Sequence, residues 1–225
     1  MALYNDLNLD QRVQLIPEGY GYGNAWLLAA KNGYVLIDPA VPPEKVELKD
    51  QVIALIATHG HYDHVGKADA WRNFNPKLKL MIHEAEAAMI MDKMLNASLF
   101  FGRGIDIAKP DILLRDGQEI ELGDNLFLRV YHTPGHTEGA SCFLYLSKQD
   151  TAREDYIALI TGDTVFATDI GRMDLAGGSE EQMRQSLARL RKLREELPSD
   201  LPVLPGHGSA TTLRKLQNNY WFMHH

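Results

Sequence analysis

Short apolar runs separated by turn-forming residues fill the first third of the chain and predict β-strands. Two of these runs, residues 24–30 and 34–37, are separated by Lys-Asn-Gly at 31–33, which is typical of a β-hairpin. Residues 12–16 alternate between polar and apolar side chains and predict another strand. The continuous apolar run VIALIA at 52–57 predicts a strand that is buried on both faces.

Helical and strand patterns alternate along the rest of the chain. We expect a helix over about 63–74 and a short strand over 78–82, and residues 84–95 have a strongly helix-forming composition. Further strands are predicted over residues 119–122, 126–131, 141–146, 156–160 and 202–204.

The clearest helix covers residues 180–197, where apolar side chains recur at helical spacing and predict one buried face. Ser179 can cap its first turn, Gln182 completes a capping box, and Pro198 ends the helix. No linker rich in Pro, Gly or Ser divides the chain, so we expect one α/β domain over residues 1–225. Two sheets inside with helices outside is one arrangement that fits this mixture of elements.

Composition and charge narrow the classes of function. The 225 residues are 45% hydrophobic and 24% charged, which is typical of a globular protein and excludes a disordered one. The net charge of −7 argues against a nucleic-acid partner, because nucleic-acid binders usually carry a basic excess. The basic residues between 184 and 194 are interleaved with glutamates and predict a solvated helix face.

Targeting and redox signals are absent from the sequence. No apolar run approaches the roughly 18–20 residues that cross a bilayer, and the first 20 residues lack the pattern of a signal peptide. The single cysteine, Cys142, excludes a disulfide scaffold and is expected to be a small buried apolar residue. We therefore expect a cytoplasmic protein, monomeric or homodimeric, with no membrane partner.

Side chains that bind metals are concentrated after the apolar run 52–57, where the sequence reads THGHYDH. Gly60 lets the chain turn sharply, so His59 and His61 can converge on one cation. Asp63 and His64 point in a different direction and suit a neighbouring cation. Histidine and carboxylate ligands without a thiolate are typical of catalytic Zn, Fe or Mn sites. The alternative is a cluster of surface histidines at the start of a helix.

Three further turns carry a histidine or an aspartate beside a glycine. They are HTPGHT at 132–137, TGDT at 161–164 and PGHG at 205–208, and each follows a predicted strand. If these strand ends meet at one edge of a sandwich, the polar side chains form a single site, and a small molecule is the expected substrate.

Taken in this order, the four motifs resemble those of the metallo-β-lactamase superfamily, and within it those of the glyoxalase II-like (hydroxyacylglutathione hydrolase-like) hydrolases. The resemblance covers essentially the whole chain, from residue 24 to residue 207. It implies an α/β fold, a four-layer αβ/βα sandwich, with the metal site at one edge of the two sheets.

The resemblance also implies a ligand set for two divalent cations, with Zn expected and Fe or Mn as alternatives. The implied ligands are His59, His61 and His136 for the first cation, Asp63, His64 and His207 for the second, and Asp163 as a bridge between them. Asp38 is implied as the acceptor of a hydrogen bond from a ligand imidazole, although an aspartate that only forms a turn is an alternative. His132 is expected at a strand end rather than among the ligands, and His83 is expected to be structural.

Residues 171–174, GRMD, stand where related enzymes show GRTD. Arg172 and Asp174 are therefore expected in a loop near the substrate, and a purely structural ion pair is the alternative. Arg214 and Lys215 are the only Lys or Arg residues after His207, so residue matching does not support recognition of glutathione.

The resemblance implies hydrolysis of a small thioester. Bound cations lower the pKa of water from about 15.7 to about 7, so a hydroxide held between two of them can attack at neutral pH. A thiolate leaves without being protonated first, which suits a thioester better than an amide. Asp63 and Asp163 are the catalytic carboxylates, expected to act as ligands and orienting groups rather than as nucleophiles. A mononuclear iron persulfide dioxygenase and a lactone or ester hydrolase remain as alternatives.

Overall fold

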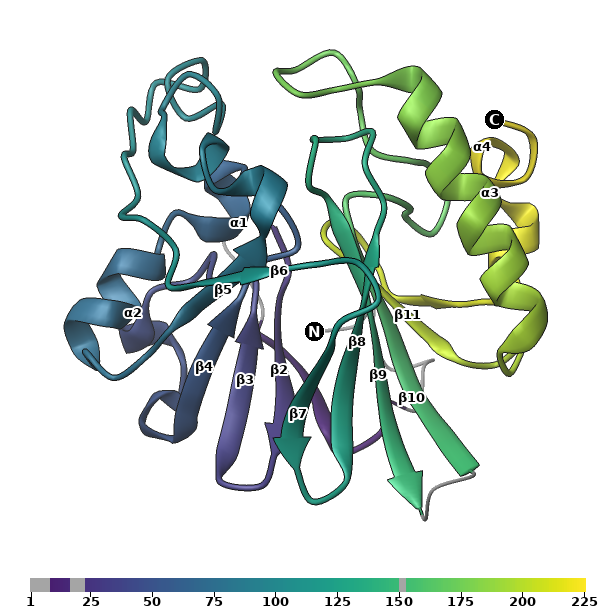
Figure 1. Cartoon of the computed structure of the whole chain (residues 1–225), viewed down its shortest axis with the longest axis horizontal. Helices are drawn as coiled ribbons and strands as arrows, with labels where there is room; N and C mark the ends of the chain where they lie inside the picture. Colours follow the sequence, from purple (N-terminus) through teal and green to yellow (C-terminus); the bar gives the residue numbers. More distant parts are fainter. Residues whose placement is uncertain (1–8, 17–22, 150–152) are drawn as a thin grey trace.

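Two six-stranded sheets face each other in the centre of the molecule (Figure 1), in a computed structural model that describes residues 9–16, 23–149 and 153–225. The first sheet contains, in spatial order, β1 (Val13–Ile16), β2 (Ala25–Ala30), β3 (Gly33–Ile37), β4 (Val52–Ile56), β5 (Leu80–His83) and β6 (Ile112–Leu114). The second contains β12 (Thr211–Thr212), β11 (Pro202–Pro205), β10 (Arg153–Gly162), β9 (Ser141–Gln149), β8 (Leu126–His132) and β7 (Glu119–Gly123).

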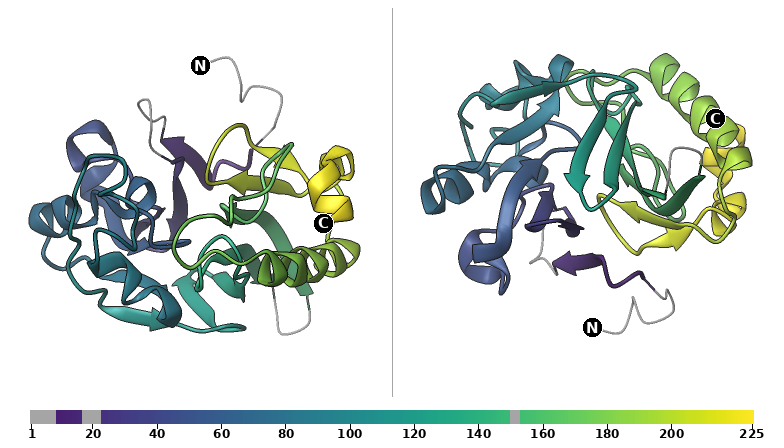
Figure 2. Two further views of the ribbon diagram at one scale, coloured as in Figure 1. Left: turned by 90° about the horizontal axis from the view of Figure 1, so that it is seen from above. Right: turned by 60° about the horizontal axis from the view of Figure 1, so that its bottom comes forward.

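Helices lie on the outer face of each sheet, which gives the four-layer αβ/βα sandwich expected from the sequence (Figure 2). The α-helices of the described residues are α1 (Tyr62–Val65), α2 (Ala68–Phe74), α3 (Glu180–Glu196) and α4 (Tyr220–His224). Single 3₁₀ turns are η1 (Pro43–Lys45), η2 (Lys49–Gln51), η3 (Glu84–Glu86), η4 (Met89–Met91) and η5 (Lys215–Asn218). Among the described residues, no helix combines the length and the apolar character needed to cross a membrane.

Three apolar layers hold the sandwich together. Trp26 of the first sheet and Phe143 of the second belong to the layer between the sheets. Trp71 of α2 packs on the outer face of the first sheet, and Leu187 of α3 packs on that of the second. Because β9 is covered by the first sheet on one face and by α3 on the other, its residues from Ser141 to Ser147 are all buried.

The predicted strands are found, with β6 and β12 in addition. Residues 24–37 form the β2–β3 hairpin, in which Ala30 pairs with Gly33. Gly33 has φ +148°, and a Cβ there would collide with the backbone of Gln51, so only glycine fits at this position. The prediction that 52–57 is buried on both faces is wrong at the start of β4, where Ile53 is 42% exposed.

The helix expected over 63–74 is interrupted. It forms α1 and α2, and Lys67 between them has a non-helical backbone conformation. The amide of Lys67 donates its hydrogen bond to Pro39 O, outside the helix. After the interruption, α2 runs in a direction that places Trp71 in the apolar layer on the outer face of the first sheet.

The helix-forming composition of 84–95 also gave a wrong prediction, because the segment forms η3, η4 and turns instead of an α-helix. The Glu86 side chain enters the interior and accepts hydrogen bonds from two distant backbone amides. The Asp92 carboxylate accepts hydrogen bonds from the amides of Met94 and Leu95 and closes a turn. These contacts override a helix propensity that amounts to only tenths of a kcal/mol per residue, on the order of 0.1–0.7.

The helix predicted over 180–197 is α3, and the Ser179 hydroxyl accepts a hydrogen bond from the Gln182 amide at its N-terminus. Arg189 on its basic face is exposed, as predicted, whereas Arg191 and Arg194 are half-buried, and all three arginines make contacts that the sequence did not indicate. Arg189 forms an ion pair with Asp116, Arg191 donates to Phe222 O of α4, and Arg194 donates to Leu213 O. These arginines attach α3 to neighbouring segments.

Candidate metal centre

The strand directions bring the four sequence motifs to one edge of the sandwich. Strands β3 and β4 run parallel in the first sheet, and β10 and β11 run parallel in the second. Strand β8 has the same direction as β10, because β9 pairs antiparallel with both. The motifs follow the C-terminal ends of β4, β8, β10 and β11, and Asp38 follows β3. A hydrogen bond of 2.9 Å from the Ser141 amide to Thr58 O joins the two sheets at this edge.

Three histidines from two loops form the first group of side chains, which we call the three-histidine cluster (His59, His61 and His136). His61 Nδ1 lies 3.2 Å from His59 Nε2 and 2.9 Å from His136 Nε2. Burial lowers the pKa of His59 far below its usual value and that of His61 to about 3. The imidazoles are therefore neutral at physiological pH, the state in which a ring nitrogen can bind a cation.

A second cluster (Asp63, His64 and His207) adjoins the first. His207 Nε2 lies 3.2 Å from Asp63 Oδ2 and 3.2 Å from His64 Nε2. His64 is fully buried, whereas the His207 side chain is 39% exposed, so this cluster faces solvent on the His207 side.

The Asp163 carboxylate lies between the two clusters. Its Oδ1 is 3.4 Å from His64 Nε2, and its Oδ2 is 3.5 Å from both His136 Nε2 and His207 Nε2. Burial opposes ionisation, but the neighbouring His64 and His136 hold the pKa of Asp163 well below its usual value. A Cβ at residue 206 would collide with Asp163 Oδ1, which explains the glycine before His207.

The donor set fits divalent cations. Within the described residues, His61 Nε2 and Asp163 Oδ1 are buried without a hydrogen-bond partner, and the Nδ1 of His61 faces two other ring nitrogens. A single N–H cannot satisfy several converging acceptors, whereas a cation can accept electron pairs from all of them. The structure thus brings together all seven side chains that the resemblance implied as ligands.

Asp38 holds Thr58 and His64 in position through hydrogen bonds. Its Oδ1 accepts the Thr58 amide at 2.7 Å, and its Oδ2 lies 2.8 Å from the Thr58 hydroxyl and 3.0 Å from His64 Nδ1. The carboxylate therefore fixes the ring of His64 with Nε2 directed at Asp63, Asp163 and His207. This is the position that the resemblance implied for Asp38.

His136 is oriented in a similar way, since its Nδ1 lies 2.7 Å from Arg172 O, the acceptor of its ring N–H. The Arg172 side chain forms an exposed ion pair of 2.6 Å with Asp174. Arg172 also borders the pocket over the metal centre, so the segment is both near the site and internally paired.

The other singled-out histidines and the cysteine lie outside these clusters. His132 stacks on His83 with ring centroids 4.1 Å apart, and its Nε2 lies 2.8 Å from Glu138 O. Cys142 is buried among apolar residues, and burial raises the pKa of its thiol to about 11. These positions agree with the sequence interpretation of all three residues.

A pocket of about 550 Å³ opens over the carboxylates, and sequence analysis missed its apolar wall. The wall is formed by Tyr62, Ala97, Phe101, Phe166, Ile170 and Leu175. Sequence analysis also missed Glu86, which is fully buried beside the three-histidine cluster. The only feature of the sequence that pointed to Glu86 was the glycine between two histidines. A glycine alone does not indicate which residue lies beside it.

The profile of the Metallo-beta-lactamase superfamily matches residues 19–207 of the chain. The chain belongs to this superfamily. Among its relatives, the probable metallo-hydrolase YqgX of Bacillus subtilis (strain 168) is 30% identical over 215 residues, which cover 92% of this chain and 95% of YqgX.

Two solved structures resemble this chain over most of its length. BLEG-1, described as a B3 metallo-beta-lactamase, is 31% identical with a TM-score of 0.79 and covers 95% of this chain and 100% of its own. TTHA1623, solved in a di-iron-bound form, is 29% identical with a TM-score of 0.72. The match covers 92% of this chain and 98% of TTHA1623. The comparisons identify the superfamily, and the narrower likeness to glyoxalase II-like enzymes stays a prediction.

Proposed function

We propose that this protein is a dinuclear metallohydrolase that cleaves a small thioester into a carboxylic acid and a thiol. The observation that carries the proposal is the Asp163 carboxylate, which lies within 3.5 Å of ring nitrogens in both clusters. A carboxylate in that position can be shared by two cations. The name of YqgX and the di-iron form of TTHA1623 support a two-metal hydrolase.

The side chains hold and orient the reacting groups. One cation would be held by the three-histidine cluster, His59, His61 and His136. The other would be held by the second cluster, Asp63, His64 and His207, and Asp163 would bind both cations. When bound, divalent cations supply a nucleophile derived from water at neutral pH and polarise a carbonyl group. Asp63 and Asp163 act as ligands and orienting groups.

The lining of the pocket favours a substrate whose leaving group departs without being protonated. In hydrolysis, the oxygen of water forms a bond to the acyl carbon, and the C–S bond breaks with its electron pair going to sulfur. The thiolate takes up a proton only after it has left, so no side chain has to supply one. Apart from the seven side chains assigned to the cations, Tyr62 and Arg172 are the only polar side chains in the described pocket lining, and Arg172 is paired with Asp174.

A β-lactam is the second candidate substrate. It is favoured by the similarity to BLEG-1, which has a TM-score of 0.79 in a match that covers 100% of the BLEG-1 chain. β-Lactam hydrolysis breaks a C–N bond within a ring, and its amine nitrogen is a poorer leaving group than a thiolate, so the thioester remains the leading proposal.

The test compares three classes of substrate on one preparation. Protein stripped of metal and then reloaded with Zn²⁺, Mn²⁺ or Fe²⁺ is assayed with acetyl and decanoyl thioesters of one small thiol, a simple lactone and a chromogenic cephalosporin. We expect metal-dependent turnover with the highest kcat/KM for the thioester. A higher kcat/KM for the cephalosporin or the lactone would overturn the thioester proposal. One iron per chain with oxygen consumption would instead indicate the dioxygenase alternative.

A further inference from the structure

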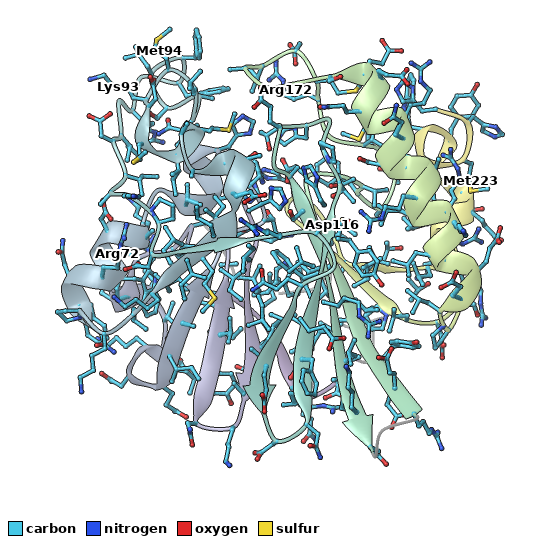
Figure 3. All side chains as sticks on the ribbon, in the orientation of Figure 1. Arg72, Lys93, Met94, Asp116, Arg172 and Met223 are labelled. Carbon is cyan, nitrogen blue, oxygen red and sulfur yellow. The ribbon has the colours of Figure 1, made fainter. Side chains whose placement is uncertain are left out.

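Half of the exposed large apolar residues in the described parts of the chain lie in a single short segment. Twelve such residues are exposed, and six of them form what we call the apolar rim: Met91, Met94, Leu95, Leu99, Phe100 and Phe101. A concentration of this kind marks a binding surface more often than scattered single residues do. The rim lies on the loops above the first sheet, where Figure 3 labels Met94.

The apolar rim is continuous with the pocket over the metal centre. Phe101 belongs to both, since it lines the pocket and is 52% exposed. Its ring lies 5.6 Å from that of Tyr62, which stands between His61 and Asp63 in the sequence. The ring of Phe166, which also lines the pocket, lies 6.2 Å from that of His207. An apolar path therefore leads from the metal ligands to the rim.

We propose that this path binds the acyl chain of the substrate, and that the substrate is a thioester with a long, uncharged acyl chain. The inference rests on the proposed hydrolase function and adds the acyl group to it. A charged acyl group would find only one cationic side chain in the described pocket lining, that of Arg172, which Asp174 already neutralises. An alkyl chain would cover the apolar wall and the exposed ring of Phe101.

The test is a series of thioesters from acetyl to decanoyl with the same thiol. We expect kcat/KM to rise by up to about fourfold for each added methylene until the pocket is filled. Phe101→Ala should lower the decanoyl-to-acetyl ratio of kcat/KM at least about tenfold. Phe74→Ala, which removes an equally large and 41% exposed ring on α2, is the matched control and should leave the ratio unchanged.

Two results separate this inference from the proposed function. Metal-dependent turnover with the same kcat/KM for every chain length would overturn the inference alone, as would an unchanged ratio in Phe101→Ala. If no thioester is turned over, the proposed function fails, and calorimetric binding of decanoate and acetate still tests the acyl site. We expect decanoate to bind at least about 100-fold more tightly than acetate, and equal affinities would overturn the acyl site.

A separate observation concerns Glu86, which connects the two loops of the three-histidine cluster. Its Oε2 accepts the amide of Gly60 and its Oε1 accepts the amide of Gly139, both at 2.6 Å. Gly60 lies between His59 and His61, and Gly139 lies in the loop that carries His136. The side chain is fully buried, so solvent does not compete for these hydrogen bonds.

Both partner positions need glycine because Glu86 fills the space beside them. A Cβ at residue 60 would lie 2.6 Å from Glu86 Oε2, and one at residue 139 would lie 2.7 Å from Glu86 Cγ. We infer that Glu86 is a positioning residue that sets the distance between His61 and His136. It acts through the backbone of the two loops, because the hydrogen bonds that it accepts there come from backbone amides.

The test measures cation affinity and fold stability separately. Glu86→Gln replaces one acceptor with a donor that faces an amide N–H, and we expect Co²⁺ affinity, measured by competition with a chelator, to fall about 10- to 100-fold. The visible absorption bands of bound Co²⁺ should also shift. Glu84→Gln changes an exposed neighbour on the same turn and should leave both unchanged. A lower melting temperature in Glu86→Gln with unchanged Co²⁺ affinity and spectrum would overturn the inference.

Glu86→Asp keeps the test decisive if the glutamine variant does not fold. It retains the charge but shortens the side chain by one methylene, so only one amide can be reached at a time. An affinity for Co²⁺ equal to that of the unmodified protein would again overturn the positioning role.

Discussion

Replacement of His61 by alanine is expected to lower kcat/KM by roughly 10³-fold or more. His61 Nδ1 is the central atom of the three-histidine cluster, within 3.2 Å of a ring nitrogen on each of the other two histidines. Without it, only two histidines of that cluster remain to hold a cation. The bound cation, measured by elemental analysis after gel filtration, should fall from two per chain to one or fewer.

His132→Ala is the matched control for this variant. His132 precedes His136 in the same motif, but its ring stacks on His83 and its Nε2 bonds to Glu138 O, outside the clusters. Its removal should leave cation content and kcat/KM within about twofold of the unmodified protein. Unchanged turnover in His61→Ala would refute the assigned site, as would a loss in His132→Ala as large as that in His61→Ala.

Asp38→Asn is expected to weaken cation binding about 10- to 100-fold. Asp38 has φ +54°, a conformation that asparagine tolerates well, so the backbone can be kept. The variant removes the charge that faces His64 Nδ1 at 3.0 Å and one of the acceptors for Thr58. Competition with a chelator would measure the loss, and urea unfolding of metal-free protein should show a further decrease of about 1–3 kcal/mol in the free energy of unfolding.

Asp124→Asn provides the control, because Asp124 also has a positive φ, +50°, but lies exposed in the turn between β7 and β8. It should change neither cation affinity nor stability. If Asp38→Asn bound cations as tightly as Asp124→Asn, the supporting role of Asp38 would be wrong.

Local patterns predicted much of the fold because each strand carries its own signal. The β2–β3 hairpin follows from two apolar runs and a turn, and α3 follows from apolar spacing and the Ser179 cap. The grouping of His59, His136, Asp163 and His207 was predictable as well, since each stands beside a glycine or in a glycine-containing turn after a strand.

The rest depended on contacts between distant residues, which no local pattern contains. Glu86 is 26 residues from Gly60 and 53 from Gly139, and these hydrogen bonds decide that residues 84–95 form turns instead of a helix. The arginines of α3 could not be assigned their partners for the same reason. The apolar wall of the pocket was missed because Phe101 and Phe166 lie in irregular segments, where apolar residues have no periodicity to reveal their role.

The most direct test of the account is the number of cations that each chain binds. Metal-stripped protein is reloaded with excess Zn²⁺, Mn²⁺ or Fe²⁺, separated from free metal by gel filtration and analysed for its elements. Seven converging side chains with Asp163 between the clusters predict two cations per chain for at least one of these metals. A ratio that stays at one or below with all three metals would contradict the dinuclear centre.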